Sequence, residues 1–285
     1  MPELPEVQTT VDGLNKTVKG RRIVMVSTSY NSHYYKNKDE VKNPEFFKKF
    51  KRKVVGQKIL KAERRAKNVL IHLGNHETIL VHMKMTGHFV YDRPQTTFVR
   101  LDLTLDNTKH LVLSDMRKFA KVTLIKTTEL RESLHLKHLG PEPLDKSFNF
   151  KIFNNQLQKK PGGKIKQVLM DQSLISGIGN IYSDEILWRA GVHPLSTVGK
   201  IPKNNLEIMF KATKELLRQG IDFGGDSMSD YRNIKGEKGR FQEHHRAYQK
   251  HKTKCVKKSC SGVLEKMSVG GRTAHFCPIH QRLFI

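Results

Sequence analysis

The spacing of apolar residues changes near residue 140, which limits the chain to folds with a β-rich part followed by a helical part. Between Arg21 and Lys126, short apolar runs recur, and in Val99–Leu105 every second side chain is apolar. Such alternation predicts strands with one buried face, as in a β-sandwich or barrel. The predicted strands are RIVMV, KNVLIHL, TILVHM, FVRLDLTL and HLVLS.

Helical spacing marks both the amino terminus and the second half of the chain. The apolar stripe of the first predicted helix is Val7, Val11, Leu14 and Val18. Pro5 lies near the start of this helix and Gly20 follows its end, as these residue types commonly do. The later predicted helices are FNFKIFNNQLQ, KIKQVLMDQ, IYSDEILWRAG and PKNNLEIMFKATKELLRQG. The sequence therefore predicts an α+β protein.

The segment HLGPEPLDKS separates the two parts and contains the proline and glycine of a connecting loop. We expect a β-sandwich domain at 1–137, a linker at 138–147, a helical domain at 148–249 and a C-terminal appendage at 250–285. A chain of this length favours about two domains.

Basic residues exceed acidic ones by a wide margin, with 52 Lys and Arg against 27 Asp and Glu and a net charge of +25. This excess predicts a polyanionic partner, although charge alone does not distinguish DNA, RNA or anionic lipid. The sequence contains neither the roughly 20 consecutive apolar residues of a membrane span nor a signal-peptide pattern. We expect an intracellular protein that is cytoplasmic or associated with the nucleoid if its source is bacterial, and that is neither secreted nor membrane-bound.

All three cysteines lie in the last 31 residues. Four residues separate Cys255 from Cys260, sixteen separate Cys260 from Cys277, and His280 follows three positions later. Two close pairs of sulfur and nitrogen ligands across a hairpin suit a closed, structural zinc site. A metal-free hairpin is the alternative interpretation.

The segment Ser176–Glu185, SGIGNIYSDE, places two glycines before a predicted helix. Gly177 and Gly179 permit close approach of the backbone, and the amides at the start of a helix near Asn180 attract anions. We interpret this segment as a phosphate-binding turn. An ordinary glycine turn between packed helices would have the same local pattern.

Taken together, these motifs closely resemble the formamidopyrimidine-DNA glycosylase and endonuclease VIII family of base-excision repair enzymes. The resemblance is nearly end to end. It rests on MPELPEV, RRAKNVLIHL, HMKMTG, SDMRKF, HLGPEPL, LMDQSLISGIGNIYSDEILWRAGVHP and the cysteine-containing finger. Leu4 favours the formamidopyrimidine branch, whose members remove oxidised purines. The resemblance implies a β-sandwich with a flanking catalytic helix, a helix-two-turn-helix domain and a C-terminal zinc finger.

By this resemblance, Pro2 is the nucleophile and Glu3 the proton carrier. Removal of Met1 exposes a secondary amine, whose attack on the sugar C1′ gives an iminium ion directly. The amine must be unprotonated to attack. An α-amino group has a pKa of about 7.7 to 8.0 in model peptides, and nearby cations are expected to lower that of Pro2. A carboxylate near a helix start is the alternative interpretation of Glu3.

The resemblance assigns further roles to residues that bind DNA. Lys67 and Arg272 correspond to the family's active-site lysine and to the finger arginine that holds a phosphate. The predicted backbone contacts are Lys166, Asn180 and Tyr248. The predicted residues that fill the space left by an everted base are Met85, Arg117 and Phe119. Without the family context, Met85, Phe119 and Tyr248 would instead be predicted to pack in the protein.

A polar, glycine-rich stretch begins at Gly224 and is too long for a simple turn. By resemblance it is a mobile lid over the everted purine, although such a loop is often disordered without ligand. The predicted base contacts are Ser227, Met228, Ser229, Asp230 and Tyr231.

Two features of the finger depart from the family pattern. Cys255 and Cys260 have four intervening residues where two are usual, and His280 replaces a fourth cysteine. We still expect one structural Zn²⁺ held by Cys255, Cys260, Cys277 and His280, no organic cofactor and a monomer.

The predicted function is that of a DNA glycosylase and apurinic/apyrimidinic lyase acting on 8-oxoguanine and formamidopyrimidines in double-stranded DNA. One alternative is an endonuclease VIII-like enzyme for oxidised pyrimidines. Another is a catalytically silent protein that binds damaged DNA, against which Pro2, Glu3 and Lys67 argue together.

Overall fold

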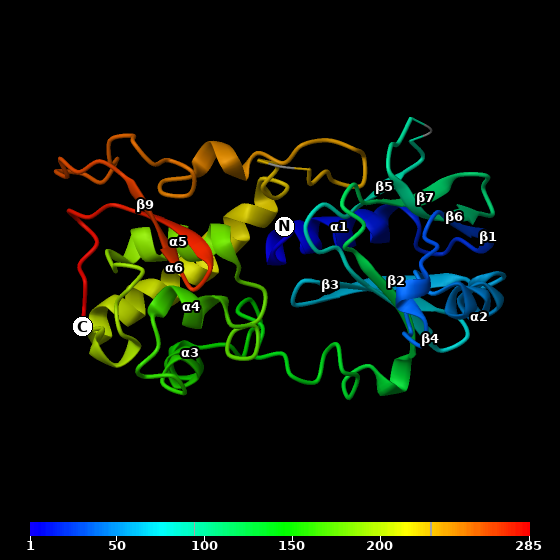
Figure 1. Cartoon of the computed structure of the whole chain (residues 1–285), viewed down its shortest axis with the longest axis horizontal. Helices are drawn as coiled ribbons and strands as arrows, with labels where there is room; N and C mark the ends of the chain where they lie inside the picture. The colour runs from blue at the N-terminus through cyan, green and yellow to red at the C-terminus, as the bar shows by residue number, and fades with distance from the viewer. Residues whose placement is uncertain (94, 229) are drawn as a thin grey trace. The chain divides into compact units, whose positions relative to one another are not determined.

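The computed structural model describes residues 1–93, 95–228 and 230–285, which form two compact units. The first unit comprises Met1–Lys137 and Phe223–Arg240, and the second comprises His138–Asp222 and Phe241–Ile285. Figure 1 shows the two larger sheets in the first unit, and most of the helices with a short β-hairpin in the second. Within the described residues, no helix is long and apolar enough to cross a membrane.

Two antiparallel, four-stranded sheets form the first unit. The first has the order β1-β6-β7-β5 and the second β2-β3-β4-β8. The strands are β1 Ile23–Thr28, β2 Ile59–Arg65, β3 Asn68–Leu73, β4 Glu77–His82, β5 His88–Tyr91, β6 Val99–Leu105, β7 His110–Ser114 and β8 Lys121–Lys126. Side chains from both sheets, including Leu103 and Ile71, share one apolar core, so the predicted sandwich is confirmed.

Two α-helices accompany these sheets, α1 Leu4–Thr17 and α2 Pro44–Val54. The predicted stripe of α1 is buried in the sandwich core. Asn15 fixes α1 to β2, because its side-chain amide donates to the Ala62 carbonyl at 2.9 Å and accepts the Ala62 N–H at 2.8 Å. Short 3₁₀ turns occur at η1 His33–Tyr35 and η2 Thr127–Glu129.

The second unit is mostly helical. Its helices are α3 Phe150–Leu157, α4 Ile165–Met170, α5 Asn180–Ala190 and α6 Lys203–Asp222, with 3₁₀ turns at η3 Val198–Lys200 and η4 Phe241–His244. A hairpin of β9 Glu265–Val269 and β10 Arg272–Phe276 follows. Helices thus form in the four segments where the sequence predicts them.

Two segments are grouped differently from the sequence-based expectation. The expected linker 138–147 is bonded to the second unit, because Gly140 donates to the Gln172 carbonyl at 2.8 Å and Ser176 donates to the Pro141 carbonyl at 3.1 Å. The segment Phe223–Arg240, expected in the helical domain, is grouped with the first unit. Ile234 explains this grouping, since its side chain is part of the sandwich core.

Candidate active site and nucleic-acid interface

Pro2 and Glu3 lie directly before the first turn of α1, and both are buried. The apolar stripe anchors this helix in the sandwich core, so the amino terminus is held in place rather than trailing from the fold. Glu3 is in extended conformation at the N-cap position, and Pro5 lies in the first turn, where a missing N–H costs no helix hydrogen bond. The structure therefore presents Pro2 from a rigid element.

Glu6, one turn further along α1, is a site residue that the sequence analysis did not identify. Its carboxylate accepts the backbone N–H of Glu3 at 2.7 Å and that of Asp226 at 2.7 Å. Burial, together with the negative charge of Glu3, raises the pKa of Glu6 to about 7. One buried carboxyl therefore joins the amino terminus to a segment more than two hundred residues away.

The segment expected to cover the lesion is tied to α1 at two points. Besides the bond from Asp226 to Glu6, the Tyr231 hydroxyl donates to the Glu6 carbonyl at 3.0 Å. The Ser227 hydroxyl donates to the Tyr231 carbonyl and accepts the N–H of Gly239, each at 2.9 Å. Ser227 and Tyr231 are buried.

The remaining predicted base contacts of this loop differ in placement. Met228 is 46% exposed and Asp230 is half-buried. Ser229 lies outside the described residues. The loop thus offers Met228 to the surface, while Ser227 and Tyr231 hold its two ends together.

Lys67 lies in the tight turn between β2 and β3, where Ala66 has a φ of 53°. It is 6% exposed, so its aliphatic part is covered. Arg64, at the end of β2, donates to the side-chain oxygen of Gln8 on α1 at 2.9 Å, which fixes this hairpin against the helix that carries Pro2. Burial and the nearby Lys84 and Lys67 ammonium groups lower the pKa of His82 to about 3.

A turn between β7 and β8 presents Arg117 and Phe119 at the surface. The Arg117 guanidinium lies 4.7 Å from the centre of the Phe119 ring, which is 48% exposed. Asp115, which is fully buried, holds the base of this turn by accepting the Ala120 N–H at 2.7 Å and the Thr86 hydroxyl. Asp115 also escaped the sequence analysis.

Met85 lies in the turn between β4 and β5 and is half-buried. Thr86 directly after it accepts the backbone N–H of Arg117 at 3.0 Å. The two turns are therefore hydrogen-bonded to each other, and the structure brings the segments of the predicted trio together.

In the second unit, α5 begins at Asn180, where the phosphate-binding turn was predicted. Gly177 has a φ of 91°, which glycine adopts easily. Gln172 holds the turn from within, donating to the Ile178 carbonyl at 2.7 Å and accepting the Gly177 N–H at 2.9 Å. This closed turn fixes the position at which the helix starts.

Lys166 on α4 is fully buried and forms an ion pair with Asp184 of α5. The second carboxylate oxygen of Asp184 accepts the backbone N–H of His275, in β10, at 2.9 Å. The ammonium group of Lys166 does not face solvent in this structure, and the phosphate contact expected of Lys166 stays a prediction. The ion pair joins α4, α5 and the hairpin.

Glu185, the next residue of α5, anchors the chain before the finger. Its buried carboxylate accepts the N–H groups of Arg246, Ala247 and Tyr248, at 2.9, 3.0 and 2.8 Å. Burial holds the pKa of Glu185 above its ordinary value, although the charge of His245 and these hydrogen bonds act in the opposite direction. The half-buried Tyr248 ring contacts His275, with ring centres 5.2 Å apart.

The ligand atoms of Cys255, Cys260, Cys277 and His280 lie within 4.8 Å of one another. The Cys255 Sγ to His280 Nδ1 distance is 3.2 Å, and the Cys260 and Cys277 sulfurs are 3.6 Å apart. Ligands about 3.3 to 4 Å apart are expected around a tetrahedral metal with sulfur bonds near 2.3 Å. The cluster could therefore hold a metal ion.

A neighbouring carbonyl selects the nitrogen that His280 would offer. The other ring nitrogen, Nε2, lies 3.0 Å from the Trp188 carbonyl. A proton on Nε2 that donates to this carbonyl leaves the Nδ1 lone pair facing Cys255.

Arg272 is exposed and follows the Gly270–Gly271 turn, whose φ angles of 57° and 73° suit a tight hairpin.

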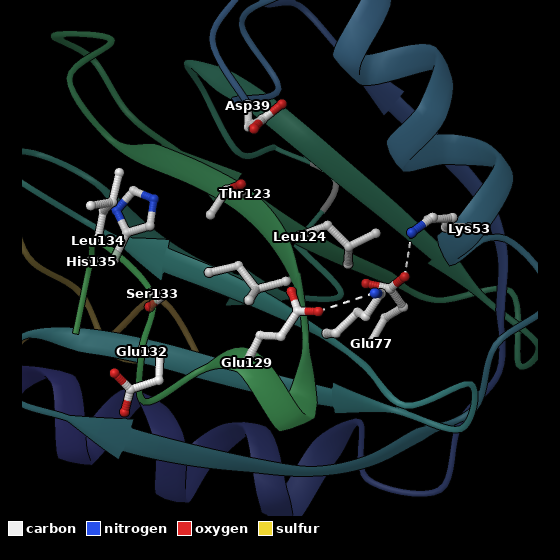
Figure 2. Close-up of a pocket in the computed structure, with 12 residues that line it drawn as sticks. Asp39, Lys53, Glu77, Thr123, Leu124, Glu129, Glu132, Ser133, Leu134 and His135 are labelled. Atoms are coloured by element: carbon white, nitrogen blue, oxygen red, sulfur yellow. Dashed lines mark hydrogen bonds and ion pairs between the residues drawn. The ribbon is translucent and has the colours of Figure 1, made fainter. Parts of the chain in front are cut away.

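A separate pocket in the first unit is acidic (Figure 2). Its carboxylates belong to Asp39, Glu77, Glu129 and Glu132. Lys53 forms an ion pair with Glu77, and Lys126 forms one with Glu129 at 3.0 Å. Because carboxylates repel phosphate, this pocket does not belong to the candidate DNA interface.

Two family models match the chain. The model of the formamidopyrimidine-DNA glycosylase N-terminal domain matches residues 1–122, and that of the formamidopyrimidine-DNA glycosylase H2TH domain matches residues 139–232. The first match begins at the terminus that carries Pro2, and the second includes the turn before α5. These matches define the class of the protein as a helix-two-turn-helix DNA glycosylase.

Several relatives match this chain along its full length. The formamidopyrimidine-DNA glycosylases of Herpetosiphon aurantiacus and Bacillus cereus are both 35% identical to this chain, and both alignments cover 99% of it. They cover 100% of the first relative and 99% of the second. The chain belongs to the formamidopyrimidine-DNA glycosylase family, as its motifs predicted.

Solved structures confirm the predicted fold class. Lactococcus lactis Fpg in complex with DNA containing an abasic site has a TM-score of 0.87 and 30% identity, covering 98% of this chain and 99% of that one. A mutant of the same enzyme in complex with DNA containing Fapy-dG also has a TM-score of 0.87 and 30% identity, covering 99% and 100% of the two chains.

Proposed function

We propose that this protein is a base-excision repair enzyme that removes oxidised purines from double-stranded DNA and then cleaves the strand by β,δ-elimination. The observation that carries this proposal is its full-length similarity to Fpg enzymes solved with abasic-site DNA and with Fapy-dG DNA. A net charge of +25 suits a DNA partner. The proposed substrates include 8-oxoguanine and formamidopyrimidines.

Pro2 is the proposed nucleophile. After Met1 is removed, the amine nitrogen bonds to C1′ of the lesion nucleotide, the bond from C1′ to the base breaks, and the base departs with a proton. Opening of the sugar ring then gives an iminium ion, which withdraws electrons from C2′. Loss of a C2′ proton expels the 3′ phosphate, a second elimination expels the 5′ phosphate, and water finally releases Pro2. The burial of Pro2 at a fixed helix start supports this role.

Glu3 is the proposed general acid and base for the sugar ring oxygen and the iminium stage. Its backbone is held by Glu6, so its position relative to the amine is set within α1. Lys67 and Arg272 are the proposed phosphate-binding cations of the active site. The proposal for Lys67 rests on the hairpin that is fixed against α1, and the proposal for Arg272 rests on its exposed position after the finger turn.

Met85, Arg117 and Phe119 are the proposed residues that replace the everted base in the stack. This proposal rests on the hydrogen bond between the two turns that carry these residues and on the contact of the Arg117 guanidinium with the exposed Phe119 ring. The proposed contacts to the DNA backbone are Lys166, Asn180 and Tyr248. The lesion-capping role of residues 227–231 is proposed from the position of the loop beside α1.

Borohydride trapping tests the enzyme proposal. Wild-type protein mixed with abasic-site DNA should give a covalent adduct, because borohydride reduces the iminium to a stable amine. Pro2→Gly should lose most of the adduct, and Glu3→Gln should slow base excision by about 10²- to 10⁴-fold. Glu132→Gln removes an exposed carboxylate elsewhere and serves as the control. Trapping that is absent from the wild-type protein would contradict the lyase proposal and favour a silent damage-binding protein.

Lesion preference needs a separate measurement, because the oxidised-pyrimidine alternative predicts the same adduct. Duplexes with one 8-oxoguanine, one formamidopyrimidine or one oxidised pyrimidine should be compared under single-turnover conditions. Faster excision of the two purine lesions is expected. The reverse order would assign the enzyme to an endonuclease VIII-like activity.

We also propose that the metal cluster holds one structural Zn²⁺, coordinated by Cys255, Cys260, Cys277 and His280. When bound, the ion would order the finger that carries Arg272. Metal analysis should give about one zinc per chain, and Cys277→Ser should lower both zinc content and DNA affinity. Pure, DNA-binding protein without zinc would contradict this assignment.

A further inference from the structure

The strongest concentration of charge outside the candidate active site lies on α2. Its sequence, PEFFKKFKRKV, contains five cations in six consecutive positions and one acidic residue, Glu45. Phe50 and Val54 are buried in the sandwich core, with Phe46 and Phe47 packed beside them. This packing fixes which face of the helix points to solvent.

All five of these cations are exposed. Lys48 and Arg52 lie on the face of α2 opposite Phe50, and Lys49 and Lys51 lie to either side of that face. The fifth, Lys53, forms an ion pair with Glu77. Among the described residues, none of the other four cations forms an ion pair with an acidic side chain. The surface therefore holds four positive charges that are not compensated within the part of the chain that is described.

Helix stability explains only part of this arrangement. Cations in the last turn interact favourably with the helix dipole, which accounts for Lys51 and Arg52. Lys48 lies one turn earlier, and its spacing to Lys51 and Arg52 places like charges side by side, which destabilises a helix. An anionic partner would turn this repulsion into attraction.

The spacing of the charges fits a DNA backbone. Residues 48 to 52 span about 6 Å of helix axis, and a duplex carries about four phosphate charges in 7 Å of its own axis. An open pocket lined by Lys48, Lys51, Arg52 and Val55 lies on this face. The cations and their groove thus match the charge density of the polyanion that this protein is proposed to bind.

Within the first unit, this surface is separated from the candidate catalytic terminus. Figure 1 shows α1 running from the amino terminus towards the end of the unit where α2 lies. The four cations are therefore not part of the group formed by Pro2, Glu3 and Glu6. A DNA segment on α2 would be additional to the segment that presents the lesion.

We propose that the α2 surface, defined by Lys48, Lys49, Lys51 and Arg52, is a second DNA-binding site that contacts the phosphates of another duplex segment. It lets the enzyme hold a second segment before releasing the first, which speeds transfer between DNA sites. This inference rests on the proposed function, because the same class of ligand occupies both sites.

Transfer kinetics test the proposal with a charge-matched pair of variants. The α2 variant is Lys48→Gln/Lys49→Gln/Lys51→Gln/Arg52→Gln. The control, Lys16→Gln/Lys19→Gln/Lys36→Gln/Lys137→Gln, removes four exposed, scattered cations of the same unit. Neither variant changes a buried apolar residue, and thermal unfolding checks that both are folded.

Each protein is loaded on a short labelled duplex and then mixed with rising concentrations of unlabelled duplex. Wild-type dissociation should accelerate with competitor concentration, because transfer proceeds through a complex with two duplexes. The α2 variant should lose this acceleration, and the salt slope of the transfer step should fall by about 3 to 4. The control variant with scattered substitutions should retain most of the acceleration by competitor.

Excision from the short lesion duplex is measured in parallel and should be equal in all three proteins. Absent excision in the wild type would contradict the proposed function, whereas equal transfer in both variants would overturn only the second site. Vesicles of anionic phospholipid provide a further arm. Loss of vesicle binding in the α2 variant, with DNA transfer intact, would assign the surface to a membrane and overturn the proposal.

Discussion

Glu6 in the first unit and Asp184 in the second are both buried carboxylic acids that join segments far apart in the sequence, but their surroundings differ. Asp184 has the Lys166 ammonium beside it and accepts the His275 N–H. Glu6 accepts two backbone N–H groups and lies near the carboxylate of Glu3. The comparison teaches that one linkage depends on a fixed ion pair, while the other can change its charge near neutral pH.

Breaking the ion pair should have the largest effect on stability. Lys166→Met leaves the Asp184 carboxylate buried without its ammonium partner and should lower the free energy of unfolding by about 3 to 5 kcal/mol. Urea unfolding measures this change. Lys160→Met is the matched control, because its ion pair with Asp171 lies at the surface and should contribute less than about 1 kcal/mol. Equal losses in the two variants would show that the buried ion pair contributes no more to the free energy of unfolding than the surface ion pair.

Glu6→Gln should change the pH dependence of the free energy of unfolding, which tests whether the Glu6 linkage titrates. The raised pKa means that the folded protein binds more protons than the unfolded chain between about pH 4.5 and 7. Wild-type stability should therefore fall by roughly 3 kcal/mol as the pH rises through this window. The glutamine variant should lack this component.

Urea unfolding at several pH values between 5 and 8 checks the prediction, with Glu132→Gln as the exposed-carboxylate control. The informative quantity is the difference between the two variants, because histidines titrate in the same range. Parallel pH profiles in Glu6→Gln and Glu132→Gln would remove Glu6 as the titrating link.

Tyr231→Phe should have the smallest effect, because it removes only a hydroxyl group and keeps the ring. Loss of the bond from the Tyr231 hydroxyl to the Glu6 carbonyl should cost about 1 kcal/mol. Hydrogen exchange should rise in Phe223–Arg240, since one of its ties to α1 is gone. Tyr34→Phe, at an 80% exposed ring, is the control. Unchanged exchange in the segment would show that the Asp226 bond alone holds it.

Regular patterns made much of the fold predictable. The apolar stripe of α1 and the alternation of β6 appear in the structure where the sequence places them. By contrast, β2 was not predicted, because a bulge between Ile59 and Lys61 interrupts its alternation. The helix α2 was also missed, since its cations obscure a stripe made of only a few large apolar residues.

The candidate site was predictable where a residue's chemistry lies in a local motif. Pro2 and Lys67 could be proposed from the family motifs around them, and the four metal-ligand candidates from their spacing. Asp115 and Asp184 could not be chosen in this way, because their partners are distant in the chain. Glu6 lies three residues from Glu3, and only its bond to Asp226 joins distant segments. A buried acid is identified by the hydrogen-bond donors around it. The spacing of residues along the sequence does not indicate donors that come from distant segments.

The sequence by itself determined the periodicities, the charge excess, the terminal Pro2 and the spacing of the cysteines, because these depend on neighbouring residues. Only the tertiary structure decided that Lys166 is buried and that Phe223–Arg240 is bound to α1. The physical reason is that desolvation and hydrogen bonding depend on which distant segments meet. The same reason applies to Glu6 and Asp184. The sequence places Glu3 one turn before Glu6, but only folding brings the Asp226 N–H to Glu6 and the Lys166 ammonium group to Asp184.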